Sequence, residues 1–134
     1  MDGQTNLPTD FELKVRAEER ERVLKLLTVL DDKKAIDIVA VDVADKTIIA
    51  DWFVICSGAS PLQVKAICDE VCDKAPELEL TLRRKEGYNE GRWIVLDFGY
   101  ILLHIFHPDE REYYNIERLW IDGTTELIRY PFAK

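Results

Sequence analysis

The chain has 134 residues, 47% of them hydrophobic, and a formal net charge of −8. The length fits one domain whose core needs no disulfides, and the hydrophobic content excludes an intrinsically disordered chain. The negative charge argues against binding a nucleic-acid backbone through bulk electrostatics. Three cysteines, an odd number, indicate free thiols in a reducing compartment, for which the cytoplasm is the simplest choice.

The N-terminal part of the sequence predicts one amphipathic helix. Thr9 and Glu12 have the spacing of a capping box, so we expect the helix to begin there and to run to about Leu30. Its apolar face consists of residues at helical spacing: Val23, Leu26, Leu27 and Leu30. Residues 1–8 lack the basic region and apolar core of a signal peptide. No run of about 18 apolar residues predicts a membrane-spanning helix.

Two strands and a second helix are predicted next. The strands are Ile36–Val43 and Trp52–Cys56, and the second is apolar throughout, which indicates burial on both faces. Ser60 is a favourable N-cap and Pro61 fits the first helical position, so a helix is expected from there to about Lys74. Its inward-facing residues are Val64, Ile67, Cys68 and Val71.

A β-hairpin is the clearest pattern in the chain. Two apolar runs, Trp93–Leu96 and Ile101–Phe106, flank a short connection containing Gly99, and glycine accepts the positive φ angles that tight connections need. A short edge strand is expected before the hairpin at Glu79–Leu82. The basic run Arg83–Lys85 follows it and is typical of a charged guard on a sheet edge.

The last predicted helix begins at His107–Pro108, with acidic residues in its first turn. Its apolar face consists of Tyr113, Ile116, Leu119 and Trp120, and Asn115 is expected to interrupt it. A further strand is expected at Glu126–Tyr130. This order of elements predicts an α/β (α+β) fold, with one mixed sheet of about five strands and helices packed on it.

The sequence does not predict a metal site or a cofactor. Cys68 and Cys72 share a helix face, but zinc needs about four ligands. Cys56, His104 and His107 would have to supply the others. Buried free thiols are the commoner state of such cysteines.

Catalytic motifs are also incomplete. The Gly58–Ser60 turn before a helix could hold an anion. However, neither Asp42 with Asp45 nor Asp69 with Glu70 has the alternate spacing that points two carboxylates to one side of a strand. No Walker-type phosphate loop and no nucleophile elbow occurs in the sequence. A capped helix is the simpler interpretation of the turn.

The polar and aromatic residues of the hairpin indicate a binding surface. Trp93 and Asp97 lie on the same side of one strand, and a buried Asp97 would need a partner. A partly exposed sheet face removes this difficulty, and Trp and Tyr are enriched in protein interfaces. His104 lies inside an apolar strand and is expected to be a hydrogen-bonded structural or interface histidine. These features favour a binding module over an enzyme.

Several sequence blocks occur in a fixed order with characteristic spacing. They are Asp37–Asp42, Ala50–Cys56, Gly58–Val64, Glu86–Gly87 with Trp93–Gly99, His104–Phe106, and Arg111–Trp120. Together they resemble the ribosomal silencing factor family, also called Iojap-related proteins. The expected organisation is an N-terminal segment with its helix, a silencing-factor-like domain and a C-terminal tail: residues 1–33, 34–120 and 121–134.

The resemblance implies a nucleotidyltransferase-like fold without the catalytic carboxylates, and a protein that is not an enzyme. It implies binding to the intersubunit face of the large ribosomal subunit through that subunit's protein fourteen, with little direct RNA contact. Binding there would block joining of the small subunit and repress translation. The net charge of −8 suits a basic ribosomal protein as the partner.

The docking residues that the resemblance implies are Trp93, Asp97, His104, Phe106, Tyr114, Leu119 and Trp120. Trp93 and Phe106 would supply apolar contact, and Asp97 would accept hydrogen bonds. Leu119 and Trp120 could instead pack the last helix onto the sheet. Three alternatives stay open: a large-subunit assembly factor, a nucleotidyltransferase-like enzyme, and a homodimer that forms away from the ribosome.

Overall fold

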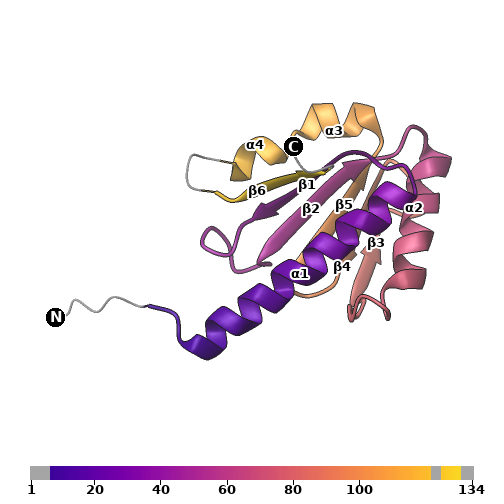
Figure 1. Cartoon of the computed structure of the whole chain (residues 1–134). Helices are drawn as coiled ribbons and strands as arrows, with labels where there is room; N and C mark the ends of the chain where they lie inside the picture. Colours follow the sequence, from indigo (N-terminus) through magenta and orange to yellow (C-terminus); the bar gives the residue numbers. More distant parts are fainter. Residues whose placement is uncertain (1–6, 122–124, 131–134) are drawn as a thin grey trace.

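The computed structural model describes residues 7–121 and 125–130 of the chain (Figure 1). The helices are α1 (Asp10–Asp32), α2 (Pro61–Lys74), α3 (Pro108–Tyr114) and α4 (Glu117–Trp120). The strands are β1 (Ile36–Asp42), β2 (Trp52–Ser57), β3 (Arg84–Glu86), β4 (Trp93–Asp97), β5 (Ile101–Phe106) and β6 (Leu127–Tyr130).

The strands form one mixed sheet with the order β3-β4-β5-β2-β1-β6. Among the described strands, β2 and β5 are parallel neighbours and the other pairs are antiparallel. The predicted α+β fold is therefore confirmed, with six strands where about five were expected. β4 and β5 form the predicted hairpin, and Gly99 in its connection has a φ of 92°.

The expected strand at Glu79–Leu82 is wrong, because the backbone there extends the end of α2. The amide of Glu79 donates to the carbonyl of Pro76 (3.0 Å) and that of Leu80 to the carbonyl of Ala75 (2.9 Å). Glu79 also has a φ of 59°, which is incompatible with a strand. Sheet pairing starts only at Arg83. The short edge strand β3 that follows is charged throughout, which disfavours pairing of this edge with another chain.

Helices α1 and α2 cover one face of the sheet, and α1 crosses in front of the strands in Figure 1. The capping box is present, with Thr9 Oγ1 accepting from the Glu12 amide (3.0 Å) and Glu12 accepting from the Thr9 amide (2.8 Å). Ser60 caps α2 as predicted. The apolar residues predicted to face inward are buried: Val23, Leu26, Leu27, Leu30, Val64, Ile67, Cys68 and Val71.

The opposite face of the sheet is covered only in part, by α3 and α4. A second, smaller core there includes Val39, Phe53 and Phe106, and Trp120 packs against it. Asn115 has left-handed angles (φ 44°, ψ 52°) and separates α3 from α4, which confirms the expected interruption. The short helices leave part of the sheet beside them uncovered.

The segment after Trp120 returns to the sheet, where β6 pairs antiparallel with β1. Across the described ranges, we find no helix with the combined length and apolar character that crossing a bilayer requires.

Candidate protein-binding surface

Aromatic side chains gather on the partly covered face of the sheet. The antiparallel register sets Trp93 of β4 opposite Phe106 of β5, and their rings stack with centroids 4.8 Å apart. The ring of Tyr114 from α3 lies 4.8 Å from that of Trp93. We call the following residues the aromatic cluster: Phe53, Trp93, His104, Phe106, Tyr114 and Trp120.

His104 is buried inside the aromatic cluster and is only 7% exposed. Its Nδ1 accepts a hydrogen bond of 3.1 Å from the indole Nε1 of Trp93, and its ring lies 5.3 Å from that of Phe53. Burial lowers the pKa of His104 to about 4, because the surrounding rings cannot solvate a charged imidazolium. His104 is therefore neutral at pH 7 and makes a structural hydrogen bond.

The other predicted aromatic residues differ in exposure. Phe106 is fully buried beneath Trp93, so it supports the indole and does not supply contact surface, contrary to expectation. Trp120 packs edge-on against Phe53, with ring centroids 5.1 Å apart. Tyr114 is 50% exposed and Leu119 is 73% exposed. Of the last two residues of α4, Trp120 thus packs onto the sheet and Leu119 points away from it.

Asp97 ends β4 and is partly exposed. Its Oδ1 accepts a hydrogen bond of 2.8 Å from the amide of Gly99, so the carboxylate stabilises the hairpin connection. Asp97 also lies on the edge of a groove on the uncovered part of the sheet. The groove is lined by Ile49, Arg84, Glu86, Val95, Asp97 and Leu102.

Sequence reasoning missed the apolar residues of this groove. Val95 alternates with Trp93 and Asp97 along β4, so strand periodicity could have assigned it to the same face. Ile49 is 63% exposed and its neighbour Ile48 is wholly exposed. Both lie in the connection between β1 and β2, where only the tertiary structure brings Ile49 beside the hairpin.

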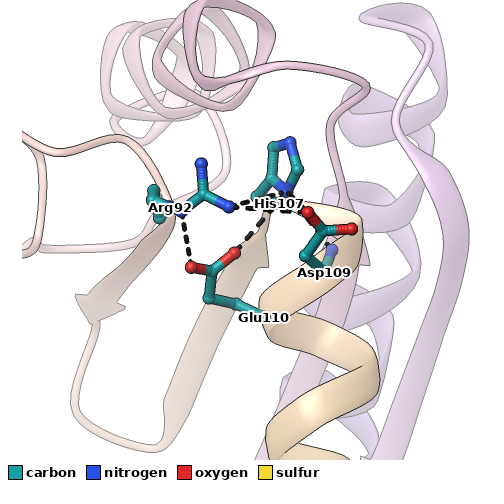
Figure 2. A network of polar contacts seen from close by, with 4 residues as sticks. All are labelled: Arg92, His107, Asp109 and Glu110. Atoms are coloured by element: carbon teal, nitrogen blue, oxygen red, sulfur yellow. Dashed lines mark hydrogen bonds and ion pairs between the residues drawn. The ribbon is translucent and has the colours of Figure 1, made fainter.

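A polar network fixes the start of α3 at one end of this face (Figure 2). Arg92, just before β4, donates from Nε to Glu110, and this bond lowers the pKa of the Glu110 carboxyl. His107 Nδ1 accepts from the Asp109 amide (3.2 Å) and caps the helix. The His107 amide donates to the Arg92 carbonyl (2.8 Å). These bonds hold α3 against β4, so that Tyr114 lies over Trp93.

The described part of the chain gives little support for a metal site, a reactive cysteine or an anion site. No group of His, Cys, Asp and Glu side chains there is arranged to hold a metal ion. Cys56 and Cys68 are buried, and burial raises the pKa of each thiol to about 12, so neither is a thiolate at neutral pH. Ser60 Oγ accepts from the amide of Gln63 (3.2 Å), which is the bond of an ordinary helix cap.

Fold and surface together define a small α+β protein with a partly uncovered, aromatic sheet face. Residues 16–131 match the family described as ribosomal silencing factor during starvation, and the chain belongs to that family. The match extends beyond residues 34–120 on both sides. The family's name describes a regulator of the ribosome.

Individual relatives agree with this assignment. The ribosomal silencing factor of Bacillus subtilis is 46% identical over 93 residues, which cover 69% of this chain and 79% of that protein. A crystal structure of a Chromobacterium violaceum protein is similar with a TM-score of 0.72 at 32% identity, covering 75% of this chain and 84% of that one. A mouse protein named for mitochondrial assembly of the ribosomal large subunit is 29% identical over 103 residues, covering 71% of this chain and 43% of its own.

Proposed function

We propose that this protein binds the large ribosomal subunit at its intersubunit face, through ribosomal protein fourteen, and blocks joining of the small subunit. Translation is repressed by steric exclusion, without catalysis, in the cytoplasm where ribosomes work. The observation that carries the proposal is the aromatic and apolar sheet face that α3 and α4 leave uncovered, in a member of the silencing factor family.

The docking surface in this proposal combines exposed anchors with the groove beside them. Its anchors are Trp93, Tyr114 and Leu119, and its groove residues are Ile49, Val95, Asp97 and Leu102. Partly exposed aromatic side chains held by their neighbours are typical of residues that dominate binding energy. Phe106, His104 and Trp120 support these anchors from below.

Charge favours a basic protein partner over RNA. The chain carries −8 overall, and Glu86 and Asp97 lie on the groove edge with a single arginine, Arg84. Carboxylates there can accept hydrogen bonds from Lys or Arg of a ribosomal protein, whereas a phosphate backbone would be repelled by the net charge.

The name of the mouse relative favours a second candidate, an assembly factor of the large subunit. Such a factor would use the same docking surface and differ in when it binds. The composition of large-subunit particles in a deletion strain separates the two, because an assembly role predicts immature particles and silencing predicts complete ones. A homodimer through the uncovered face, formed when the ribosome is absent, is a further outcome that gel filtration can detect.

Co-sedimentation with separated ribosomal subunits tests the proposal directly. We expect the protein to pellet with large subunits and not with small ones, and to lower the peak of assembled ribosomes in a sucrose gradient. Trp93→Ala should lose about 2 kcal/mol of binding energy, a roughly thirtyfold weaker affinity. An unchanged peak of assembled ribosomes at several-fold excess of protein would contradict steric exclusion.

Two exposed leucines provide a matched pair for locating the surface. Leu119 of α4 is 73% exposed and Leu62 of α2, on the other side of the sheet, is 78% exposed. Leu119→Ser should weaken binding to the large subunit, while Leu62→Ser should leave it unchanged. Equal effects of the two substitutions would place the docking surface elsewhere.

A further inference from the structure

We infer that His104 is a positioning residue, which holds the indole of Trp93 in its docking orientation without itself meeting the partner. This inference rests on the proposed function of the uncovered sheet face. It concerns the contact between two neighbouring strands, where the register places Trp93 and His104 two residue pairs apart, so that both side chains lie on the same face of the sheet.

The hydrogen bond between the two side chains determines where the imidazole carries its proton. An indole N–H can only donate, so the His104 Nδ1 that lies 3.1 Å from Trp93 Nε1 must be the unprotonated acceptor. A neutral imidazole then carries its proton on Nε2. The indole N–H of Trp93 donates to the lone pair on Nδ1.

The indole is restrained on several sides. Its ring stacks on Phe106 at an interplanar angle of 26°, the ring of Tyr114 lies beside it, and His104 accepts from its nitrogen. Trp93 remains half-buried, whereas His104 is only 7% exposed. A partner that approaches this face therefore meets the indole, and His104 acts through it. Because the indole of Trp93 is restrained before the partner binds, less conformational entropy is lost on binding.

The second nitrogen of His104 indicates that histidine brings a cost to stability at this position. Its Nε2 is buried and has no hydrogen-bond partner among residues 7–121 and 125–130. A buried donor without an acceptor destabilises the folded state. The ring lies among Phe53, Trp93 and Phe106, where a phenylalanine would fill the same space without an unpaired polar atom. What histidine adds at this position is the acceptor for Trp93.

Two substitutions separate positioning from packing. His104→Phe keeps an aromatic ring and removes both the acceptor and the unpaired donor. The lost bond to the partly exposed indole and the removal of the unpaired donor offset each other, so the free energy of unfolding should change little. His104→Asn keeps an acceptor, because its Oδ1 takes the place of Nδ1, but the smaller side chain should lower the free energy of unfolding. The two variants should therefore rank in opposite order for stability and for binding.

The measurements are the affinity for purified large subunits, urea unfolding, and the indole N–H signal of Trp93 in an NMR spectrum, assigned by its loss in Trp93→Ala. We expect about tenfold weaker binding for His104→Phe, together with a shifted and faster-exchanging indole signal. His104→Asn should keep the indole signal and bind more tightly than His104→Phe despite lower stability.

The outcomes distinguish this inference from the proposed function. If Trp93→Ala binds normally, the docking surface is wrong and the proposed use of this face fails. If Trp93→Ala loses binding while His104→Phe binds like the natural protein with an unchanged indole signal, the positioning role alone is overturned. Binding that follows stability in both His104 variants would likewise assign His104 to packing and overturn the inference.

Discussion

The guanidinium of Arg111 on α3 donates a hydrogen bond of 3.0 Å to the hydroxyl of Ser57, the last residue of β2. The same side chain donates to Glu117 of α4 (2.9 Å) and to the carbonyl of Ile36 at the start of β1 (3.3 Å). Arg111 thus joins both short helices to two neighbouring strands. Its side chain is only 12% exposed, so these bonds are shielded from water.

Arg111→Met should lower the free energy of unfolding by about 2 kcal/mol, because the partly buried carboxylate of Glu117 loses its partner. Urea unfolding measures the loss. Arg118 on α4 is exposed and provides the control, since Arg118→Met should change stability by less than about 0.5 kcal/mol. Similar losses in both variants would show that Arg111 does not hold α3 and α4 in place.

Gly87 precedes the hairpin in a conformation that only glycine accommodates. Its φ is 83°, and an added Cβ would lie 2.0 Å from the carbonyl oxygen of Trp93. Gly87→Ala should therefore lower stability by more than about 2 kcal/mol and displace the start of β4, with a matching loss of large-subunit binding. Thermal unfolding and co-sedimentation test both effects.

Gly99 is the control for this prediction. Its φ of 92° is also positive, but an added Cβ would meet only the flexible end of the Arg83 side chain, at 3.1 Å. Gly99→Ala should cost about 1–2 kcal/mol from backbone strain alone. A Gly87→Ala protein as stable as Gly99→Ala would contradict the close approach to Trp93.

Glu19 of α1 and Asp51, just before β2, form a pair of like-charged carboxyl groups. Burial, a hydrogen bond with Asp51 and repulsion from Asp51 together raise the pKa of Glu19 to about 7, against a smaller lowering by Arg16 and Arg22. The folded protein therefore holds this proton more tightly than the unfolded chain, where the pKa is near 4.5.

The contribution of Glu19 to stability is therefore complete below about pH 4.5 and is lost as the pH rises through about 7. The difference in unfolding free energy between the natural protein and Glu19→Gln should change across this window, in the direction of relative destabilisation of the natural protein at higher pH. Urea unfolding at several pH values measures it. A difference in unfolding free energy that does not change with pH would show that the pKa of Glu19 is not raised in the folded protein.

Local features of the fold could be predicted because their bonds join residues close in the chain. The caps by Thr9 and Ser60 each connect residues three positions apart, and the hairpin needs one tight connection at Gly99. The break at Asn115 follows from the tolerance of asparagine for left-handed angles. Such features depend on residues close in the sequence and not on contacts between distant elements.

Long-range pairing could not be predicted in the same way. The strand expected at Glu79–Leu82 formed instead at Arg84–Glu86, because carbonyls at the end of α2 bind the amides of Glu79 and Leu80. Likewise, the parallel pairing of β2 with β5 joins segments separated by a helix and two other strands. The apolar and polar pattern of one segment does not specify which strand, distant in the sequence, will pair with it.

The sequence by itself determined that the hairpin carries aromatic and polar residues at alternating positions, because strand geometry sends alternate side chains to one face. Only the tertiary structure decided that Phe106 is buried while Trp93, directly opposite it, remains partly open. The physical reason is that exposure depends on what covers a side chain. The indole of Trp93 covers Phe106, and Tyr114 of α3 covers Trp93 only in part. Arg92, His107 and Arg111 hold α3 in that position.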